Sequence, residues 1–189
     1  FASGDVASGE VVNSDSSDTI ELSTGADISG VDAEGSGAGS AFNADNLTLS
    51  GDASVTMTVA QHEGFTTIAA TGTETVTLSD SGDFTGDSAV ENYVLATGVN
   101  TFTLGSGSQS VDATADGGDT IDVQGLTATG TIETASTDTI ELSTGADISG
   151  VDAEGSGAGS AFNANNLTLS GDASVTMTVA QHEGFTTIA

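Results

Sequence analysis

The chain has 189 residues, with 28 Asp and Glu, no Lys or Arg, and a formal net charge of −28. Lys and Arg neutralise phosphates in nucleic-acid complexes, so we exclude nucleic-acid binding, and docking on anionic lipid is disfavoured for the same reason. Cys is also absent, which rules out disulfides, thiolate metal sites and Cys nucleophiles. No apolar run approaches the roughly 20 residues of a membrane span, so we expect no membrane insertion.

A long internal repeat defines the organisation of the chain. Residues 18–69 return as residues 138–189, and the two copies differ only at Asp45, which is Asn165 in the second copy. Repeats at a fixed period are typical of array proteins, whose units bury apolar faces against their neighbours. We therefore predict the end of a diverged repeat in residues 1–17, one full 120-residue unit in 18–137 and the start of the next unit in 138–189. We expect any targeting signal to lie outside this segment.

A five-residue motif recurs inside the unit: an acidic residue or Asn, then Thr or Asn, then an apolar, a polar and an apolar residue. It begins at positions 18, 45, 74, 100, 119, 138 and 165. Alternation of apolar and polar residues predicts half-buried β-strands. Further alternating segments occupy residues 55–59, 65–68, 93–95 and 129–132. Gly, Ser, Asp and Asn separate these segments and predict turns.

The spacing of the motif indicates the fold class. Successive motif starts within one unit are 27, 29, 26, 19 and 19 residues apart, and 19 residues suit a coil of two or three short strands with turns. We predict an all-β fold, a parallel β-solenoid with about five rungs per unit, stacked about 4.8 Å apart. An array of β-sandwich domains is the alternative. The solenoid would point the following residues inward: Ile20, Leu22, Leu47, Leu49, Val76, Leu78, Phe102, Leu104, Ile121, Val123, Ile140 and Leu142.

The first motif position forms a column in this register, occupied by Asp18, Asp45, Glu74, Asn100, Asp119, Asp138 and Asn165. Stacked carboxylates repel each other unless a cation lies between them, and Ca²⁺ takes about 6–8 oxygen ligands. Asp122 and Glu141 form a second acidic pair on neighbouring rungs. We predict calcium as a cofactor, with the candidate ligands Asp18, Asp45, Asp119, Asp122, Asp138 and Glu141. The alternative is structural, because Asp and Asn before a strand cap turns by bonding to nearby N–H groups, and Asn ladders stabilise solenoids without metal.

His62 and Glu63, repeated 120 positions later, are the other residues with chemical potential. One His per unit falls short of a zinc motif. Gly64 and Phe65 follow them, which indicates a turn or a single helical excursion closed by the glycine and anchored by the phenylalanine. No Ser, His and Asp constellation indicates a catalytic triad, and a chain without Lys or Arg lacks many catalytic tools. We expect no enzyme.

Two segments carry a resemblance to a known group of proteins. Residues 18–22 (DTIEL) and 55–65 (VTMTVAQHEGF) resemble the β-strand-repeat regions of very large bacterial surface and secreted proteins, including adhesins related to the repeats-in-toxin (RTX) group. The RTX nonapeptide is partly met at residues 117–121, where Asp119 and Ile121 fit the pattern. The resemblance implies secretion, an extended array at the cell surface and calcium-assisted folding outside the cell.

These observations predict a structural repeat segment of a large extracellular bacterial protein, forming a stalk, fibre, sheath, surface layer or adhesin array. Its partners would be neighbouring repeats or copies of itself, since open solenoid ends expose strand edges. A module that binds surface glycan or a protein partner along a Thr- and Ser-rich face is the second hypothesis. A polysaccharide-acting enzyme of β-helix shape is the third, and it is disfavoured because such enzymes use basic residues to stabilise their intermediates.

Overall fold

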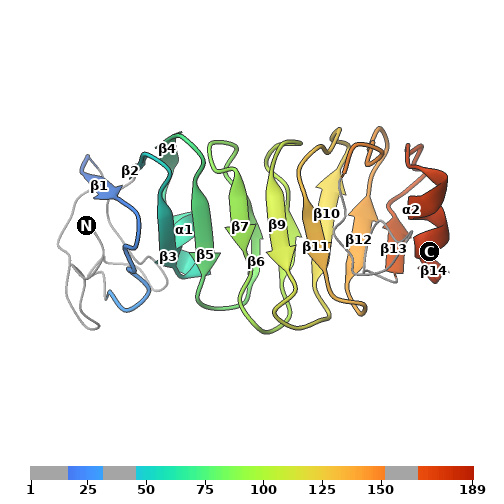
Figure 1. Ribbon diagram of the computed structural model, residues 1–189, viewed down its shortest axis with the longest axis horizontal. Coiled ribbons are helices and arrows are strands. Elements are labelled where there is room, and N and C mark those ends of the chain that lie inside the picture. The colour runs from blue at the N-terminus through green and yellow to red at the C-terminus, as the bar shows by residue number, and fades with distance from the viewer. Residues whose placement is uncertain (1–16, 32–45, 152–165) are drawn as a thin grey trace. The chain divides into compact units, whose positions relative to one another are not determined.

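The computed structural model describes residues 17–31, 46–151 and 166–189. The chain forms two compact units: unit 1 comprises Phe1–Asp80 and Ala89–Asn92, and unit 2 comprises Ser81–Ser88 and Tyr93–Ala189. Short parallel strands make up nearly all of the regular structure (Figure 1). The fold is therefore the predicted parallel β-solenoid and not a sandwich array. The loop expected at 32–43 lies outside the described residues.

Unit 1 contains two parallel pairings of strands. One sheet has the order β1-β2-β4, with β1 at Thr19–Leu22, β2 at Asn46–Ser50 and β4 at Thr67–Thr71. In the other pairing, β3 (Ser54–Met57) lies beside β5 (Thr75–Leu78). The short helix α1 (Val59–Gly64) connects β3 to β4.

Unit 2 continues the same architecture with two sheets. The larger one has the order β14-β13-β12-β10-β8-β6, formed by Thr187–Ile188, Asn166–Leu169, Thr139–Leu142, Thr120–Gln124, Thr101–Thr103 and Asp83–Thr85. The smaller one has the order β11-β9-β7, formed by Ile132–Thr134, Ser110–Ala113 and Asn92–Val94. The last two residues of β7 belong to unit 2. The helix α2 (Val179–Gly184) precedes β14.

Successive strands from β6 to β12 alternate between the two sheets, so each coil contributes one strand to each sheet. Thr101 pairs with Thr120, and Thr120 pairs with Thr139. Residues 19 positions apart therefore occupy equivalent places on neighbouring coils. This confirms the sequence prediction that an interval of 19 residues forms one coil.

The apolar core lies inside the coils. All twelve residues predicted to point inward are buried, and none is more than 7% exposed. In unit 2 the core includes a cluster of three aromatic rings, Phe84, Tyr93 and Phe102, with centroids 5.0 to 5.8 Å apart. The hydroxyl of Tyr93 accepts a hydrogen bond from the Asp87 N–H at 2.8 Å, so this buried ring keeps a partner for its polar atom.

Glycine permits the coils of unit 2 to approach at their corners. A Cβ atom at Gly105 would lie 1.8 Å from the carbonyl oxygen of Gly86, and one at Gly130 would lie 2.0 Å from that of Gln109. Both neighbours are backbone atoms of an adjacent coil and cannot move aside without breaking the stack. Glycine is therefore required at these corners for steric reasons.

The helical excursion predicted around His62 is confirmed as α1. It begins after Thr58, which forms a capping box: the Gln61 N–H donates to the Thr58 hydroxyl at 3.1 Å, and the Thr58 N–H donates to Gln61 Oε1 at 2.8 Å. Phe65 follows the helix and is 8% exposed, so it anchors the excursion as predicted. The buried Gln61 also donates from Nε2 to the carbonyl of Ile28 at 2.6 Å, which ties the helix to the first coil.

Two strand predictions need correction. The strand expected at 129–132 begins at Ile132. More importantly, β5 does not lie beside β2 as the single motif column requires. The strand β4, which lacks the full motif, pairs with β2 in its place, and β5 pairs with β3. Glu74, which precedes β5, therefore leaves the predicted column.

Candidate functional site

The first motif position forms a buried ladder in unit 2. Asn100, Asp119 and Asp138 precede β8, β10 and β12, and each is at most 1% exposed. Oδ1 of Asn100 accepts from the Gly82 N–H at 3.1 Å, and Oδ1 of Asp119 accepts from the Asn100 N–H at 2.7 Å. Oδ1 of Asp138 accepts from the N–H groups of Gly118 and Asp119 at 2.8 and 3.0 Å. Each side chain therefore binds the backbone of the preceding coil.

The choice between acid and amide in the ladder follows from the local turn. Nδ2 of Asn100 donates to the carbonyls of Ala96 and Gly98, both at 2.9 Å. Asp138 has a donor in the equivalent region, because its Oδ2 accepts from the Ala135 N–H at 2.7 Å. A carboxylate offers only acceptors, whereas an amide offers donors as well. The turn before β8 therefore needs Asn, and the turn before β12 needs Asp.

These contacts bear on the predicted calcium ligands Asp119 and Asp138. Burial raises the pKa of Asp138 and the charge of Asp119 adds to the rise, while hydrogen bonds from three backbone N–H groups oppose it. Both oxygens of Asp138 point at N–H donors, which supply the positive charge that a cation would otherwise provide. Asp138 is thus a poor fit for calcium, and the backbone contacts of Asp119 and Asp138 match the structural alternative.

The remaining predicted ligands lie elsewhere. Asp18 precedes β1 in unit 1 and is exposed, and Asp45 lies outside the described residues. Asp122 and Glu141 are direct neighbours on β10 and β12 and face outward in unit 2. Burial raises the pKa of Asp122, and the charge of Glu141 contributes to the rise, although the N–H of Gln124 donates to Asp122 at 2.7 Å. This outward pair has the oxygen donors that calcium prefers, but two carboxylates would need water to complete the coordination.

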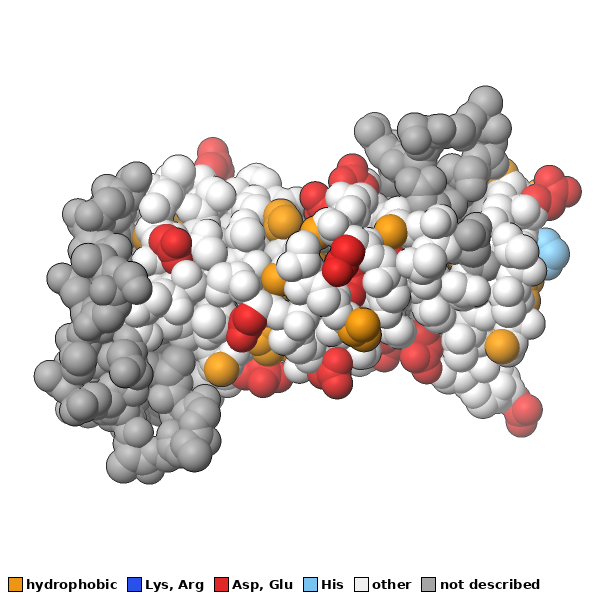
Figure 2. Space-filling model, turned by 90° about the horizontal axis from the view of Figure 1, so that it is seen from below, with side chains coloured by type: hydrophobic (Ala, Val, Ile, Leu, Met, Phe, Trp, Pro, Cys, Tyr) orange, Lys and Arg blue, Asp and Glu red, His pale blue; other side chains and the backbone are white. Residues whose placement is uncertain are grey.

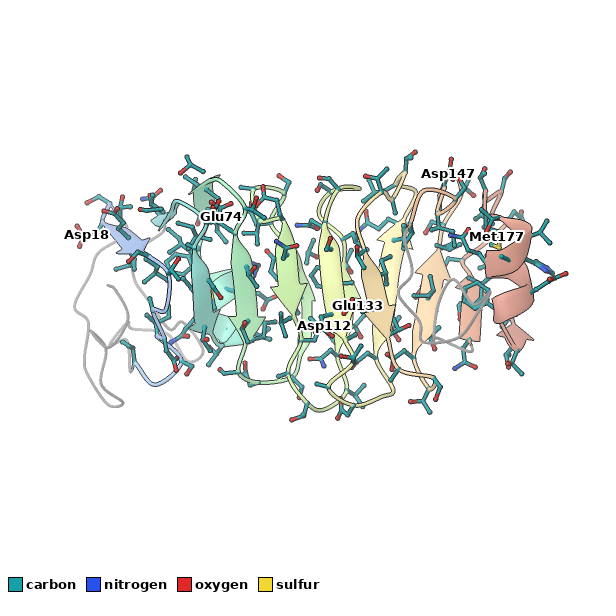
Figure 3. All side chains as sticks on the ribbon, viewed as in Figure 1. Asp18, Glu74, Asp112, Glu133, Asp147 and Met177 are labelled. Carbon is teal, nitrogen blue, oxygen red and sulfur yellow. The ribbon has the colours of Figure 1, made fainter. Side chains whose placement is uncertain are left out.

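A second like-charge pair lies on the smaller sheet. Asp112 on β9 and Glu133 on β11 are neighbours in the parallel register (Figure 3). Figure 2 shows acidic side chains at many separate points of the visible face, and the chain has no Lys or Arg to neutralise them. Cations from solution must therefore screen the outer surface.

Glu74 and Glu91 form an unusual pair of carboxyl groups in unit 1. Glu74 is fully buried, and neither of its carboxyl oxygens has a hydrogen-bond partner of ordinary geometry. Oε2 of Glu91 accepts from the backbone N–H of Glu74 at 3.0 Å, so the Glu91 carboxylate lies at the turn before β5, where Figure 3 labels Glu74. A buried carboxylate without donors is costly, so the group must be protonated or paired with a cation.

The pKa values of this pair diverge. Burial raises the pKa of Glu74, and the hydrogen bond with Glu91 and the charge of Glu91 raise it further. Burial alone would raise the pKa of Glu91 as well, but hydrogen bonds from the backbone and the protonated side chain of Glu74 outweigh it, so that pKa is lowered. The pair therefore holds one shared proton over a range of pH, with Glu74 as the acid and Glu91 as the carboxylate.

The described part of the chain contains neither a cluster of metal-ligating side chains nor a helix that could span a membrane. In that part, no three or more His, Asp or Glu side chains are grouped closely enough to hold a metal ion. None of its helices has the length and apolar character that a bilayer crossing needs. Comparisons of the chain with protein-family models, with curated proteins and with solved structures found no match.

Sequence reasoning missed several buried polar residues. Gln109 is 1% exposed; its Oε1 accepts from the Gly105 N–H at 2.7 Å, and its Nε2 donates to the Asp87 carbonyl at 2.6 Å. Glu91 was missed because it stands outside the motif. Gln109 is a long amide side chain among Gly and Ser residues, and this contrast was the sequence signal that could have indicated its role. Nothing in the sequence near Glu91 indicates that it pairs with Glu74.

Proposed function

We propose that the chain is a structural segment of an extended extracellular repeat array, of the kind that forms a stalk, fibre, sheath, surface layer or adhesin arm. The observation that carries the proposal is the side-chain ladder of unit 2. Asn100, Asp119 and Asp138 are buried polar groups that stand before successive strands of one sheet. They bind the backbone of the neighbouring coil, a contact that stabilises stacking and so supports a structural role.

The extracellular location and the calcium dependence are parts of the same proposal. A net charge of −28 without any Lys or Arg requires cations from outside the chain. Asp122 and Glu141 would hold calcium with water on the outer face of unit 2, bridging two coils. The resemblance of residues 18–22 and 55–65 to the repeats of RTX-type adhesins supports this environment, in which calcium is abundant.

The structural role is tested by a tandem series of one, two, three and four 120-residue units. A solenoid adds about 4.8 Å for every coil, so the maximum dimension from X-ray scattering in millimolar calcium should rise by the same increment for each added unit. Compact particles whose dimension grows as the cube root of mass would contradict a rod-like array. Separately folded units joined by flexible segments, with a variable distance between them, would also contradict it.

The location is tested on the source cells with an antibody raised against the folded chain. Labelling of intact cells is the expected result. Labelling that appears only after permeabilisation would place the protein inside the cell and refute the extracellular part of the proposal.

A second candidate function rests on one feature of the larger sheet. The first outward position of consecutive strands places Thr101, Thr120, Thr139, Asn166 and Thr187 in one column. Hydroxyl and amide groups at regular spacing can bind a polysaccharide with a matching repeat. A glycan array without a hit, or hits unchanged after Thr120→Val and Thr139→Val together, would rule this function out.

A further inference from the structure

The same sequence occurs in two structural contexts, once in unit 1 and once at the C-terminal end of unit 2. Residues 46–69 and 166–189 are identical. In unit 1, Val59 is 8% exposed and Ile68 is 7% exposed, whereas their counterparts in unit 2, Val179 and Ile188, are 73% and 44% exposed. Because the sequence is the same, the difference comes from what covers each copy.

In unit 1 the cover is the segment 70–80, which contains β5. Val55 pairs with Val76 and Met57 pairs with Leu78 in the parallel register, and the Ser79 N–H donates to the Met57 carbonyl at 3.0 Å. The same segment also caps α1, since Oδ1 of Asp80 accepts from the Val59 N–H at 2.8 Å. The segment therefore closes both the edge of β3 and the start of the helix.

The second copy lacks this cover among the described residues of unit 2. Residues 174–177 form no strand there; Thr176 makes only an isolated bridge to Asp147 on the inner side. Met177 is partly exposed beside α2 (Figure 3), whereas Met57 is fully buried. A row of partly exposed apolar side chains and a backbone edge with no neighbouring strand among the described residues thus lie together at this end of unit 2. We call Ser174, Val175, Met177 and Val179 the terminal edge.

We propose that the terminal edge binds a parallel strand with the repeat sequence of residues 70–80, ATGTETVTLSD. In the register of unit 1, its Val covers Val175, its Leu covers Met177 and its Asp accepts from the Val179 N–H. The partner is thus an acidic strand of alternating Thr and apolar residues, supplied by a further repeat. This inference rests on the proposed array function and specifies the contact by which one repeat receives the next.

The test uses the two methionines of the chain, which report on the two copies. We would compare the unmodified chain with a chain that carries residues 70–80 again after Ala189. Oxidation by hydrogen peroxide, followed by mass spectrometry, gives the rate at each methionine, and the exposed one should react faster. In the unmodified chain Met177 should oxidise faster than Met57, and in the lengthened chain the ratio of the two rates should fall to about one.

The matched control carries the same appended segment with its Val and Leu replaced by Asp. It has the same length and cannot cover the edge, so Met177 should oxidise as fast as in the unmodified chain. Hydrogen exchange of the Val175 and Met177 amides gives an independent reading, since only the native segment should protect them, whereas the Thr176 N–H already donates to Ala146. An equal rate at Met177 with and without the native segment would overturn the proposal.

Three other outcomes are also decisive. If the unmodified chain protects Met177 as its concentration rises, the edge binds a second folded copy, and the proposed partner is wrong. If the native segment fails to protect Met177 while the tandem series still lengthens by a constant increment, the array function holds and only this contact is refuted. If the segment protects Met177 and the tandem series does not form rods, the contact holds and the array function fails.

Discussion

The ladder of unit 2 predicts that Asp138→Asn destabilises the fold. The substitution replaces only one oxygen by nitrogen, and it removes a buried negative charge. Asp138 uses both oxygens as acceptors, for Gly118 and Asp119 on one side and for Ala135 on the other. In its less costly orientation the amide places Nδ2 at the position of Oδ2, opposite the Ala135 N–H. The Ala135 N–H and the facing N–H of the amide are then both left without an acceptor.

The size of the effect follows from these contacts. Each unsatisfied buried donor costs about 1–3 kcal/mol. Loss of the charge returns part of this cost, because burial and the charge of Asp119 both raise the pKa of Asp138. We expect the free energy of unfolding at neutral pH to fall by about 2 kcal/mol.

The control is Asp122→Asn, which removes the same charge from the outer face of the same sheet. The amide keeps an oxygen for the Gln124 N–H, and the change relieves the repulsion from Glu141. In calcium-free buffer we expect a change within about 0.5 kcal/mol. Urea unfolding followed by far-UV circular dichroism measures both variants, with hydrogen exchange of the Ala135 amide as a local reading. Equal stabilities of the two variants would refute the account of the ladder.

Three further predictions concern the acid pair, the core and calcium. The folded state binds the Glu74 proton more tightly than the unfolded state does, so the free energy of unfolding should fall as pH rises above 4.5, the ordinary pKa of a Glu side chain. Glu74→Gln should make this fall shallower and raise the stability at pH 7, as measured by urea titration. Phe102→Ala should cost about 3–5 kcal/mol in the same assay, because the ring is fully buried; a loss below about 1 kcal/mol would contradict the packing. Removing calcium with a chelator at constant ionic strength should lower the melting temperature of the wild type more than that of Asp122→Asn.

The sequence determined the strands and the core because both depend on local alternation. Val76 and Leu78 were assigned to the interior from period two alone, and both are buried even though β5 occupies a different sheet from the one expected. Alternation indicates which face of a strand is apolar, and that face can be buried in any sheet of the solenoid. The short helix was likewise predictable, since its start and its anchor are neighbours in the sequence.

The partner of each strand was decided only by the tertiary structure. The five-residue motif that begins just before β5 matches the one that begins just before β2, so the sequence favours stacking these two strands in one column. The strand β4, which pairs with β2 in the structure, has no such motif. Glu74 therefore meets Glu91, a residue that sequence reasoning gave no role. The sequence offered a structural role for Asp and Asn in the ladder as an alternative, but only the tertiary structure shows that the N–H groups they bind lie on the neighbouring coil.

The repeated segment shows this division most directly. Residues 54–57 and 174–177 have the same sequence, yet the first forms β3 and the second forms no strand. Their alternation gives both the capacity to be a strand. Strand formation also needs a neighbour that accepts the hydrogen bonds and covers the apolar side chains, and in unit 1 that neighbour is β5. Local sequence therefore sets which residues can pair, and the stacking of coils decides which of them do.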